Sequence, residues 1–110
     1  MAYKLAMEIF ELSKSFPKEE RYSLTDQIRR SSRSVCSNIA EGYRKRIYPR
    51  HFVMKISDSD AECSETLVWL NFANDCGYLS KDLKLKLILE YKEVGRMLGG
   101  MMKNPEGFLP

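Results

Sequence analysis

The stretch Gln27–Arg46, QIRRSSRSVCSNIAEGYRKR, decides how the chain is expected to fold. It carries six basic side chains and four serines, yet apolar residues recur through it and just before it at helical spacing. Placed at about 100° per residue, four of them fall on one side of a helix: Leu24, Ile28, Val35 and Ile39. Ser23 precedes them as a candidate N-cap, with Asp26 three residues later. The stretch therefore predicts an amphipathic helix that begins at Leu24 and ends between residues 42 and 46.

Three further segments of the chain repeat this period. A first helix is predicted over Ala2–Ser15, a third from Pro49 to a C-cap at Gly77, and a fourth after an N-cap at Ser80. Their apolar stripes are Ala2, Leu5, Ile9, Leu12 and Phe16; then Phe52, Ile56, Cys63, Leu67 and Leu70; then Leu83, Leu87, Tyr91, Val94, Leu98 and Met101. Because the connections are short, neighbouring helices are expected to run antiparallel. We therefore predict an all-α fold: an antiparallel up-down-up-down four-helix bundle over residues 1–103, followed by a loosely ordered tail over residues 104–110.

Length and composition exclude several classes of protein. The chain has 110 residues and a formal net charge of +3, which allows one domain with a modest core. It has no run of roughly 18 apolar residues and nothing like a secretory signal, so we expect a cytoplasmic protein without a membrane partner. Three cysteines at unrelated spacings and a single histidine, His51, predict buried free thiols, no metal site and no cofactor. Since no phosphate loop or nucleophile motif occurs either, we predict that the protein is not an enzyme.

Two of the predicted helices carry a second apolar patch that faces away from the first. Seven residues of the first and third helices form these patches: Tyr3, Met7, Phe10, Met54, Val68, Trp69 and Phe72. A bundle of this size buries one apolar face of each helix, so a second patch left in water indicates an interface. Trp and Phe are also the side chains that anchor subunit contacts best. We therefore predict a homo-oligomer with these residues at its interface.

The charges divide the chain into a basic part and an acidic part. Between residues 21 and 55, nine Lys/Arg oppose two acids, which gives a net charge of +7, and the remainder carries −4. Two stripes opposite the core result: Arg30, Arg33 and Arg44 on the second helix, and Asp58, Glu62 and Glu65 on the third. Three explanations are open: both faces are ordinary solvated surfaces, they meet across a subunit boundary, or the basic face binds phosphates.

The turn after the second helix adds aromatic side chains to the basic ones. In GYRKRIYPRH, residues 42–51, Tyr43, Tyr48 and His51 stand among four cations, a mixture that can stack on bases and hold phosphates. The candidate nucleic-acid contacts are therefore Arg29, Arg30, Arg33, Arg44, Lys45, Arg46 and Arg50.

Two longer segments resemble a known family. Residues 16–45, FPKEERYSLTDQIRRSSRSVCSNIAEGYRK, closely resemble the pattern FPKxExYxLxxQIRRAxxSIxxNIAEG of the bacterial four-helix bundle proteins encoded by intervening sequences within large-subunit ribosomal RNA genes. Residues 65–79, ETLVWLNFANDCGYL, look like the end of that family's third helix. One departure is Cys36, which stands where many relatives have proline, so the second helix is expected to be straighter here.

The resemblance implies an antiparallel four-helix bundle that forms ring-like homopentamers. A related group, the accessory proteins of diversity-generating retroelements, binds nucleic acid and a reverse transcriptase. On the matched block, we interpret Asn38 and Glu41 as hydrogen-bonding or pairing groups and Gly42 as a position that needs little bulk. The leading hypothesis is a non-enzymatic oligomeric bundle that binds RNA or DNA non-specifically through the second helix and the following turn. The alternative is a structural or adaptor assembly that binds a protein partner, with Arg30 and Arg33 at subunit contacts.

Overall fold

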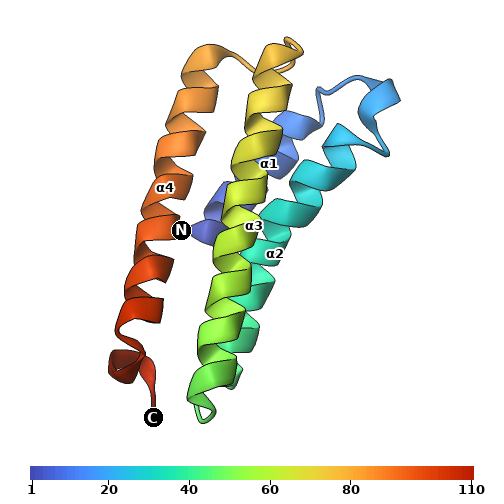
Figure 1. Cartoon of the computed structure of the whole chain (residues 1–110). Coiled ribbons are helices and arrows are strands. Elements are labelled where there is room, and N and C mark those ends of the chain that lie inside the picture. Colours follow the sequence, from blue (N-terminus) through green and yellow to red (C-terminus); the bar gives the residue numbers. More distant parts are fainter.

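The computed structural model describes every residue from Met1 to Pro110 and contains helices and turns but no strand. Four α-helices make up the fold: α1 (Ala2–Ser13), α2 (Leu24–Arg44), α3 (Pro49–Asp75) and α4 (Lys81–Lys103). Two short 3-10 helices, η1 (Lys18–Glu20) and η2 (Pro105–Phe108), precede α2 and follow α4. Successive helices run in opposite directions in one elongated bundle of 45 × 25 × 18 Å (Figure 1). The predicted all-α, antiparallel four-helix fold is confirmed.

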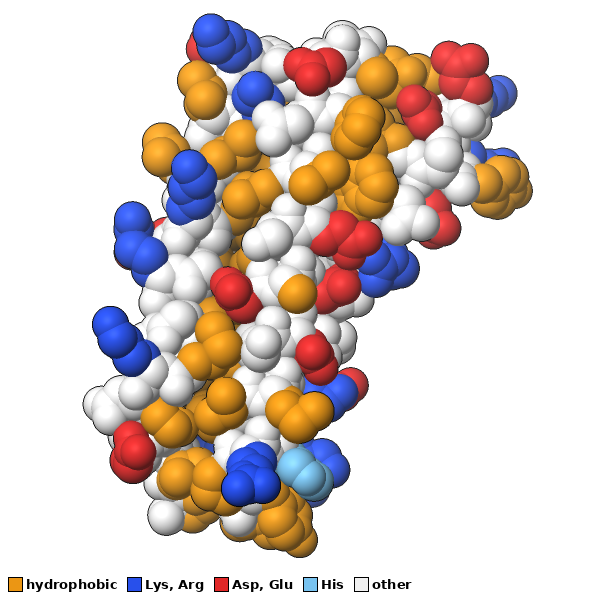
Figure 2. Space-filling view, in the orientation of Figure 1, with side chains coloured by type: hydrophobic (Ala, Val, Ile, Leu, Met, Phe, Trp, Pro, Cys, Tyr) orange, Lys and Arg blue, Asp and Glu red, His pale blue; other side chains and the backbone are white.

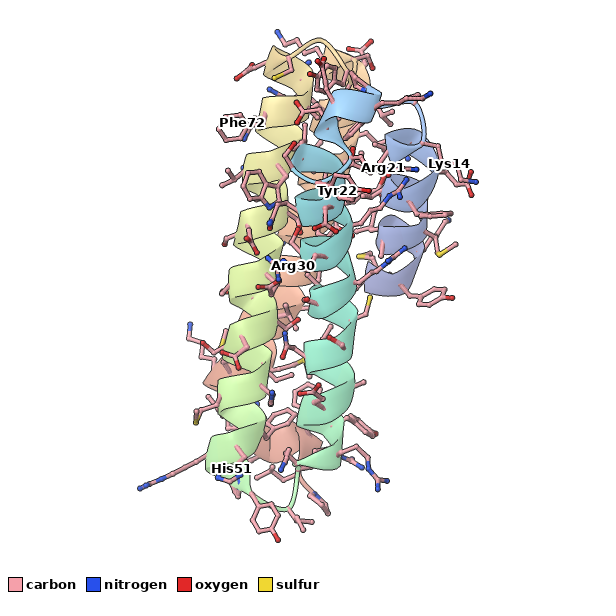
Figure 3. The ribbon with its side chains drawn as sticks, turned by 90° about the vertical axis from the view of Figure 1, so that its right-hand side faces the viewer. Lys14, Arg21, Tyr22, Arg30, His51 and Phe72 are labelled. Carbon is pink, nitrogen blue, oxygen red and sulfur yellow. The ribbon has the colours of Figure 1, made fainter.

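The short helix α1 lies opposite α3 in the bundle. It packs on α2 and, less extensively, on α4, whereas α3 packs on both α2 and α4. Figure 1 shows α1 behind α3, and the view turned by 90° in Figure 3 places these two helices on opposite sides of α2. Because α1 has 12 residues and α2 has 21, α1 cannot run alongside the whole of α2.

The core is built from the apolar stripes that the sequence predicted. Its most deeply buried large side chains are Leu5, Ile9, Ile28, Val35, Phe52, Ile56, Leu70, Leu87, Tyr91 and Leu98. Fully burying a Leu, Ile or Phe side chain contributes roughly 1.5–3 kcal/mol relative to leaving it in water. These stripes therefore supply most of the free energy that holds the four helices together.

Small and hydroxyl side chains let α2 and α3 approach each other closely. Ser59 Oγ donates a hydrogen bond of 2.7 Å to a main-chain carbonyl of α2, and Thr66 Oγ1 and Ser31 Oγ are hydrogen-bonded at 2.9 Å. These buried hydroxyls thus find hydrogen-bond partners across the two helices. A Cβ added at Gly42 would lie 3.1 Å from Ile56 Cδ1, closer than side chains normally pack. The prediction that Gly42 needs little bulk is confirmed.

The predicted end of α3 and the predicted start of α4 are also confirmed. Gly77 has a φ of 80°, the left-handed conformation that glycine adopts without strain, and the Tyr78 N–H donates back to the Ala73 carbonyl. At the start of α4, Ser80 Oγ accepts the Leu83 N–H at 3.2 Å. Together these two caps fix the short connection between α3 and α4.

The start of α2 is capped by Glu20 and not by the predicted Ser23 side chain. The Ser23 side chain caps no N–H group of the helix. Instead, the Glu20 carboxylate in η1 accepts hydrogen bonds from Ser23 Oγ at 2.6 Å, from the Leu24 N–H at 3.4 Å and from the Tyr78 hydroxyl at 3.0 Å. The bonds from Ser23 and then Tyr78 lower the pKa of Glu20, and the same contact raises the pKa of Tyr78 to about 12. Glu20 therefore links η1, α2 and the end of α3.

Two predictions at helix ends are corrected by the structure. The first helix ends at Ser13, so Phe16 lies beyond it, yet Phe16 is buried with its ring 5.7 Å from that of Tyr78. The C-terminal tail is not loose, because it forms η2 and places the Phe108 ring 6.3 Å from the Phe52 ring. In both places an aromatic side chain packs on the core and fixes a segment that lies outside the four helices.

The three cysteines are free, but they are not all buried as predicted. Cys63 is buried in the core, and burial raises its pKa to about 12. Cys36 is half-buried, and its pKa is also raised by burial. Cys76 is exposed directly after α3, at the C-cap of that helix.

Candidate nucleic-acid interface

The outward face of α2 carries a row of arginines. Arg29, Arg33 and Arg44 fall within a sector of about 60° around the helix, since successive residues are about 100° apart. From the first to the last the row extends about 22 Å at 1.5 Å per residue. The positions between them on this face are the small residues Ser37 and Ala40, both exposed. An extended anionic chain can therefore approach the helix along its whole length.

Contacts with α1 hold two of these arginines in place. Arg29 Nε donates to Ser13 Oγ at 2.7 Å. The guanidinium groups of Arg29 and Arg33 lie over the Phe10 ring, 4.8 and 5.6 Å from its centroid. Neither arginine forms an ion pair, so their charges are not neutralised within the chain.

Arg30 forms ion pairs, unlike Arg29 and Arg33 on the same helix. It lies between α2 and α3 in Figure 3, where its Nη1 pairs with Glu62 at 3.1 Å and its Nη2 pairs with Glu65. The Glu65 contact is the main reason why the pKa of Arg30 is raised. The structure thus gives a fourth explanation for the two charged stripes, an ion pair between neighbouring helices of one chain. Glu62 and Glu65 face α2 and are half-buried, and of the predicted acidic stripe only Asp58 is fully exposed.

The turn after α2 brings together the remaining predicted cations at the other end of the helix. Arg44, Lys45 and Arg50 are exposed and form no ion pair. Arg46 is half-buried: its guanidinium lies 3.5 Å from the centroid of the Tyr43 ring, and its Nε donates to the Tyr43 carbonyl at 2.9 Å. Tyr48 and His51 are exposed beside them, with ring centroids 5.6 Å apart. The aromatic and basic side chains predicted from the sequence are therefore largely exposed around this turn.

The structure adds basic residues that sequence reasoning did not assign to the site. A cleft of about 650 Å³ lies where the end of α1, η1 and the start of α2 meet. Its cations include Lys14 directly after α1, Lys18 in η1 and Arg21 directly after η1, together with Arg29 and Arg33. Figure 3 shows Lys14 and Arg21 at this end of the molecule. The Phe16–Pro17 turn was the available signal, because it folds these three residues back toward α2.

The residues predicted to form an oligomer interface are divided by the structure. Five are exposed: Tyr3, Met7, Met54, Val68 and Phe72. Phe10 is half-buried beneath Lys14, Arg29 and Arg33, and Trp69 is half-buried against the core, its indole N–H buried without a partner. In Figure 2 hydrophobic side chains gather near both ends of the face that α3 presents, with carboxylates between them. Of the seven residues, Phe10 is covered within its own chain, by the cations that lie over its ring.

A second apolar surface lies on the other side of the bundle, below the N-terminus of α1. This groove has a volume of about 310 Å³ and all of its lining residues are hydrophobic: Met1, Ala2, Tyr3, Cys36, Ile39, Val94, Met97, Leu98 and Met101. Beside the groove, the 12 residues of α1 cover only part of the longer helices α2 and α4. Sequence periodicity had placed Ile39 and Met101 in the core, but both are half-buried here.

No group of three or more His, Cys, Asp or Glu side chains is placed to hold a metal ion. None of the helices combines the length and the apolar character that crossing a membrane requires.

Comparison with known proteins places this architecture in a family. The family model that describes the 23S rRNA-intervening sequence proteins matches residues 1–100, which is nearly the whole chain. The chain belongs to this family. The resemblance predicted from the QIRR and SNIAEG segments is thus confirmed. Both segments lie in α2. In this 23S rRNA-intervening sequence protein, Asn38 Nδ2 donates to the Ser34 carbonyl at 2.9 Å and Glu41 pairs with Lys55 at 2.6 Å, as interpreted from the sequence.

A solved structure confirms the fold of the 23S rRNA-intervening sequence protein. The chain is similar to a protein of unknown function from the S23 ribosomal protein family of Bacteroides thetaiotaomicron, with a TM-score of 0.83 and 23% sequence identity. The match covers 93% of this chain and 94% of the other. No curated protein gives a significant match. The comparisons therefore establish the family and the four-helix fold.

Proposed function

We propose that this protein is a non-enzymatic homo-oligomer that binds RNA or DNA through the sugar-phosphate backbone. The contact surface is the outward face of α2 with the following turn. The observation that carries the proposal is the set of cations on this surface that form no ion pair: Arg29, Arg33, Arg44, Lys45, Arg46 and Arg50. An ordinary solvated helix face usually interleaves acids with its bases, whereas here Glu41 is the only acid on this part of α2, and it pairs with Lys55.

The arrangement of the arginines supports phosphate binding. The Phe10 ring and Ser13 restrict Arg29 before any ligand arrives, so less side-chain entropy is lost when a phosphate is bound. No sequence-reading motif accompanies the basic residues of this surface. We therefore expect binding that depends strongly on salt and weakly on sequence.

Two apolar surfaces on opposite sides of the bundle support self-association. One is the exposed stripe of Met54, Val68 and Phe72 on α3, and the other is the groove beside the N-terminus of α1. Because the two surfaces differ, contact between them joins copies head to tail, and such contacts form a ring when the rotation from one copy to the next closes. We propose a ring of this kind, with five copies as the family resemblance implies. In the ring each subunit would present the arginines of its own α2.

The binding proposal is tested with charge-neutralising variants on two helices. Arg33→Gln, Arg44→Gln and Lys45→Gln are combined in one protein. Lys81→Gln, Lys92→Gln and Lys103→Gln on α4 make the same charge change at exposed positions that form no ion pair. Anisotropy titrations with a labelled single strand and a duplex at several salt concentrations should show a weaker affinity only for the α2 variant. Its salt dependence should fall by a slope of roughly 0.7–0.9 for each phosphate contact removed.

Two results would contradict this proposal. Equal weakening in the α2 and α4 variants would show that binding reflects net charge alone. Absence of binding in the native protein would instead favour the alternative hypothesis of an adaptor assembly, in which a reverse transcriptase or another protein is the ligand. Sedimentation of the native protein and of a Val68→Asp variant tests the ring, since a charge in that contact should release single copies.

A further inference from the structure

The basic cleft at the upper end of α2 has a different shape from the rest of the basic surface. Along α2 the surface is convex and offers cations one at a time. In the cleft, basic side chains from three segments converge: Lys14 directly after α1, Lys18 in η1 and Arg21 directly after it, and Arg29 and Arg33 in α2. A convex row suits successive phosphates of a strand that each carry one charge, whereas converging cations suit one group that carries more charge.

The charge balance of the cleft leaves four cations without a carboxylate partner. Lys14 pairs with Glu11 at 3.2 Å, and Arg30, which also lines the cleft, is held by Glu62 and Glu65. Lys18, Arg21, Arg29 and Arg33 form no ion pair, and Asp26 is the only acid among the lining residues. The cleft therefore retains a surplus of positive charge that an anion can neutralise.

Neutral hydrogen-bond donors in the cleft also lack partners. Thr25 lines the cleft and is 8% exposed; its hydroxyl makes no hydrogen bond within the chain and remains accessible to solvent. The main-chain N–H groups of Thr25 and Asp26, in the first turn of α2, likewise have no acceptor. A helix start with free N–H groups favours a bound anion, and here the unpartnered Thr25 hydroxyl lies beside it.

We infer that this cleft binds a terminal phosphate monoester of a nucleic-acid strand. This inference rests on the proposed function, because the strand continues from the cleft along the arginines of α2. A terminal phosphate carries about −1.5 to −2 charges and three acceptor oxygens, whereas an internal phosphate diester carries one charge. The cleft lies at one end of the row that leads over Arg33 to Arg44, so the strand is held with its end at η1 and its interior on α2.

The test compares three short oligonucleotides of one sequence, which carry a 5′-phosphate, a 3′-phosphate or two hydroxyl ends. The fluorophore is attached internally, and affinities are measured at one salt concentration. The native protein should prefer one of the phosphorylated strands by about tenfold, which corresponds to about 1.4 kcal/mol. Lys18→Gln combined with Arg21→Gln should abolish this preference while the hydroxyl-ended strand still binds. Both side chains are exposed and form no ion pair, so the variant is expected to fold.

Two further variants separate the cleft from the row. Thr25→Val keeps the shape of the side chain, removes the hydroxyl and should reduce the preference. Arg44→Gln with Lys45→Gln should weaken all three strands together and leave the preference unchanged. Excess adenosine monophosphate as a competitor shows whether a free monoester fills the cleft: it should reduce the preference and spare the hydroxyl-ended strand.

The outcomes distinguish this inference from the proposed function. Equal affinity for the three strands would overturn the inference and leave the backbone-binding proposal intact. A preference that survives Lys18→Gln and Arg21→Gln would overturn the assignment to this cleft. Failure of every strand to bind would overturn the proposed function and the inference with it.

Discussion

The two faces of α2 have similar residue types but opposite roles in the molecule. On the face toward α3, Arg30 pairs with two glutamates, and buried hydroxyls bond across the helices. On the face toward α1 and the solvent, Arg29 and Arg33 have no carboxylate partner. One face therefore stabilises the fold, and the other keeps its charge for a ligand. The comparison shows that an arginine one residue away along a helix can serve a different purpose, because about 100° of rotation places it beside a different neighbour.

The largest expected effect is on the buried face. Ile28→Ala removes a side chain with no exposed surface, so the free energy of unfolding should fall by about 2–5 kcal/mol. Ser37→Ala, on the outward face of the same helix, should change it by less than about 0.5 kcal/mol. Urea unfolding followed by circular dichroism measures both. Similar losses in the two variants would show that the outward face is also packed, against a second copy.

Arg30 and Arg33 give the sharpest test of the division between the two faces. Arg30→Gln should lower stability by up to about 1 kcal/mol, because it breaks a partly exposed pair with two acids, and should leave nucleic-acid binding unchanged. Arg33→Gln should lower stability by no more than about 0.5–1 kcal/mol, because it loses only its contact with the Phe10 ring. It should reduce the salt slope of binding by roughly 0.7–0.9. Thermal unfolding and anisotropy titrations of both variants provide the comparison. The division fails if Arg30→Gln weakens binding as much as Arg33→Gln does.

The smallest expected effect concerns Glu20, the acid in η1 that caps the start of α2. Because hydrogen bonds lower the pKa of Glu20 in the folded state, its stabilisation is present above the ordinary glutamate pKa of about 4.3 and is lost as the pH falls through the folded value. Glu20→Gln should therefore be less stable than the native protein near neutral pH, and the difference should shrink in acid. Melting temperatures at a series of pH values measure it, with Glu19→Gln as the control.

The Tyr78 hydroxyl reports the same contact from the alkaline side. Its pKa is raised to about 12, so its contribution is complete below the ordinary tyrosine pKa of about 10 and is lost as the pH rises through about 12. Tyr78→Phe should remove that loss. A Tyr78→Phe variant with the same alkaline profile as the native protein would mean that the hydroxyl does not hold Glu20.

Much of the fold could be predicted from the sequence because it depends on local periodicity. The stripes that contain Ile28, Phe52 and Leu87 occupy the core as predicted, and Gly77 and Ser80 end and begin helices where expected. These features follow from rotation along a helix and from the conformational preferences of single residues. They do not require knowledge of which helix lies beside which.

The candidate site was predicted only in part because its parts come from several helices. Arg29, Arg33 and the turn cations belong to one continuous stretch and could be selected by spacing. Lys14 and Lys18 join them only because the chain folds back at Phe16–Pro17. Arg30 leaves the set because Glu62 and Glu65, more than thirty residues later, reach it from α3.

The sequence alone determined that this chain forms four amphipathic helices in an antiparallel bundle, since each helix carries its own apolar stripe and the connections are short. The tertiary structure decided which charges remain available, because an ion pair depends on what a neighbouring helix brings within reach. Arg30 is neutralised by α3, whereas Arg29 and Arg33 lie against an aromatic ring of α1 that offers no carboxylate. Partners of this kind depend on the packing of distant segments, which no local pattern specifies.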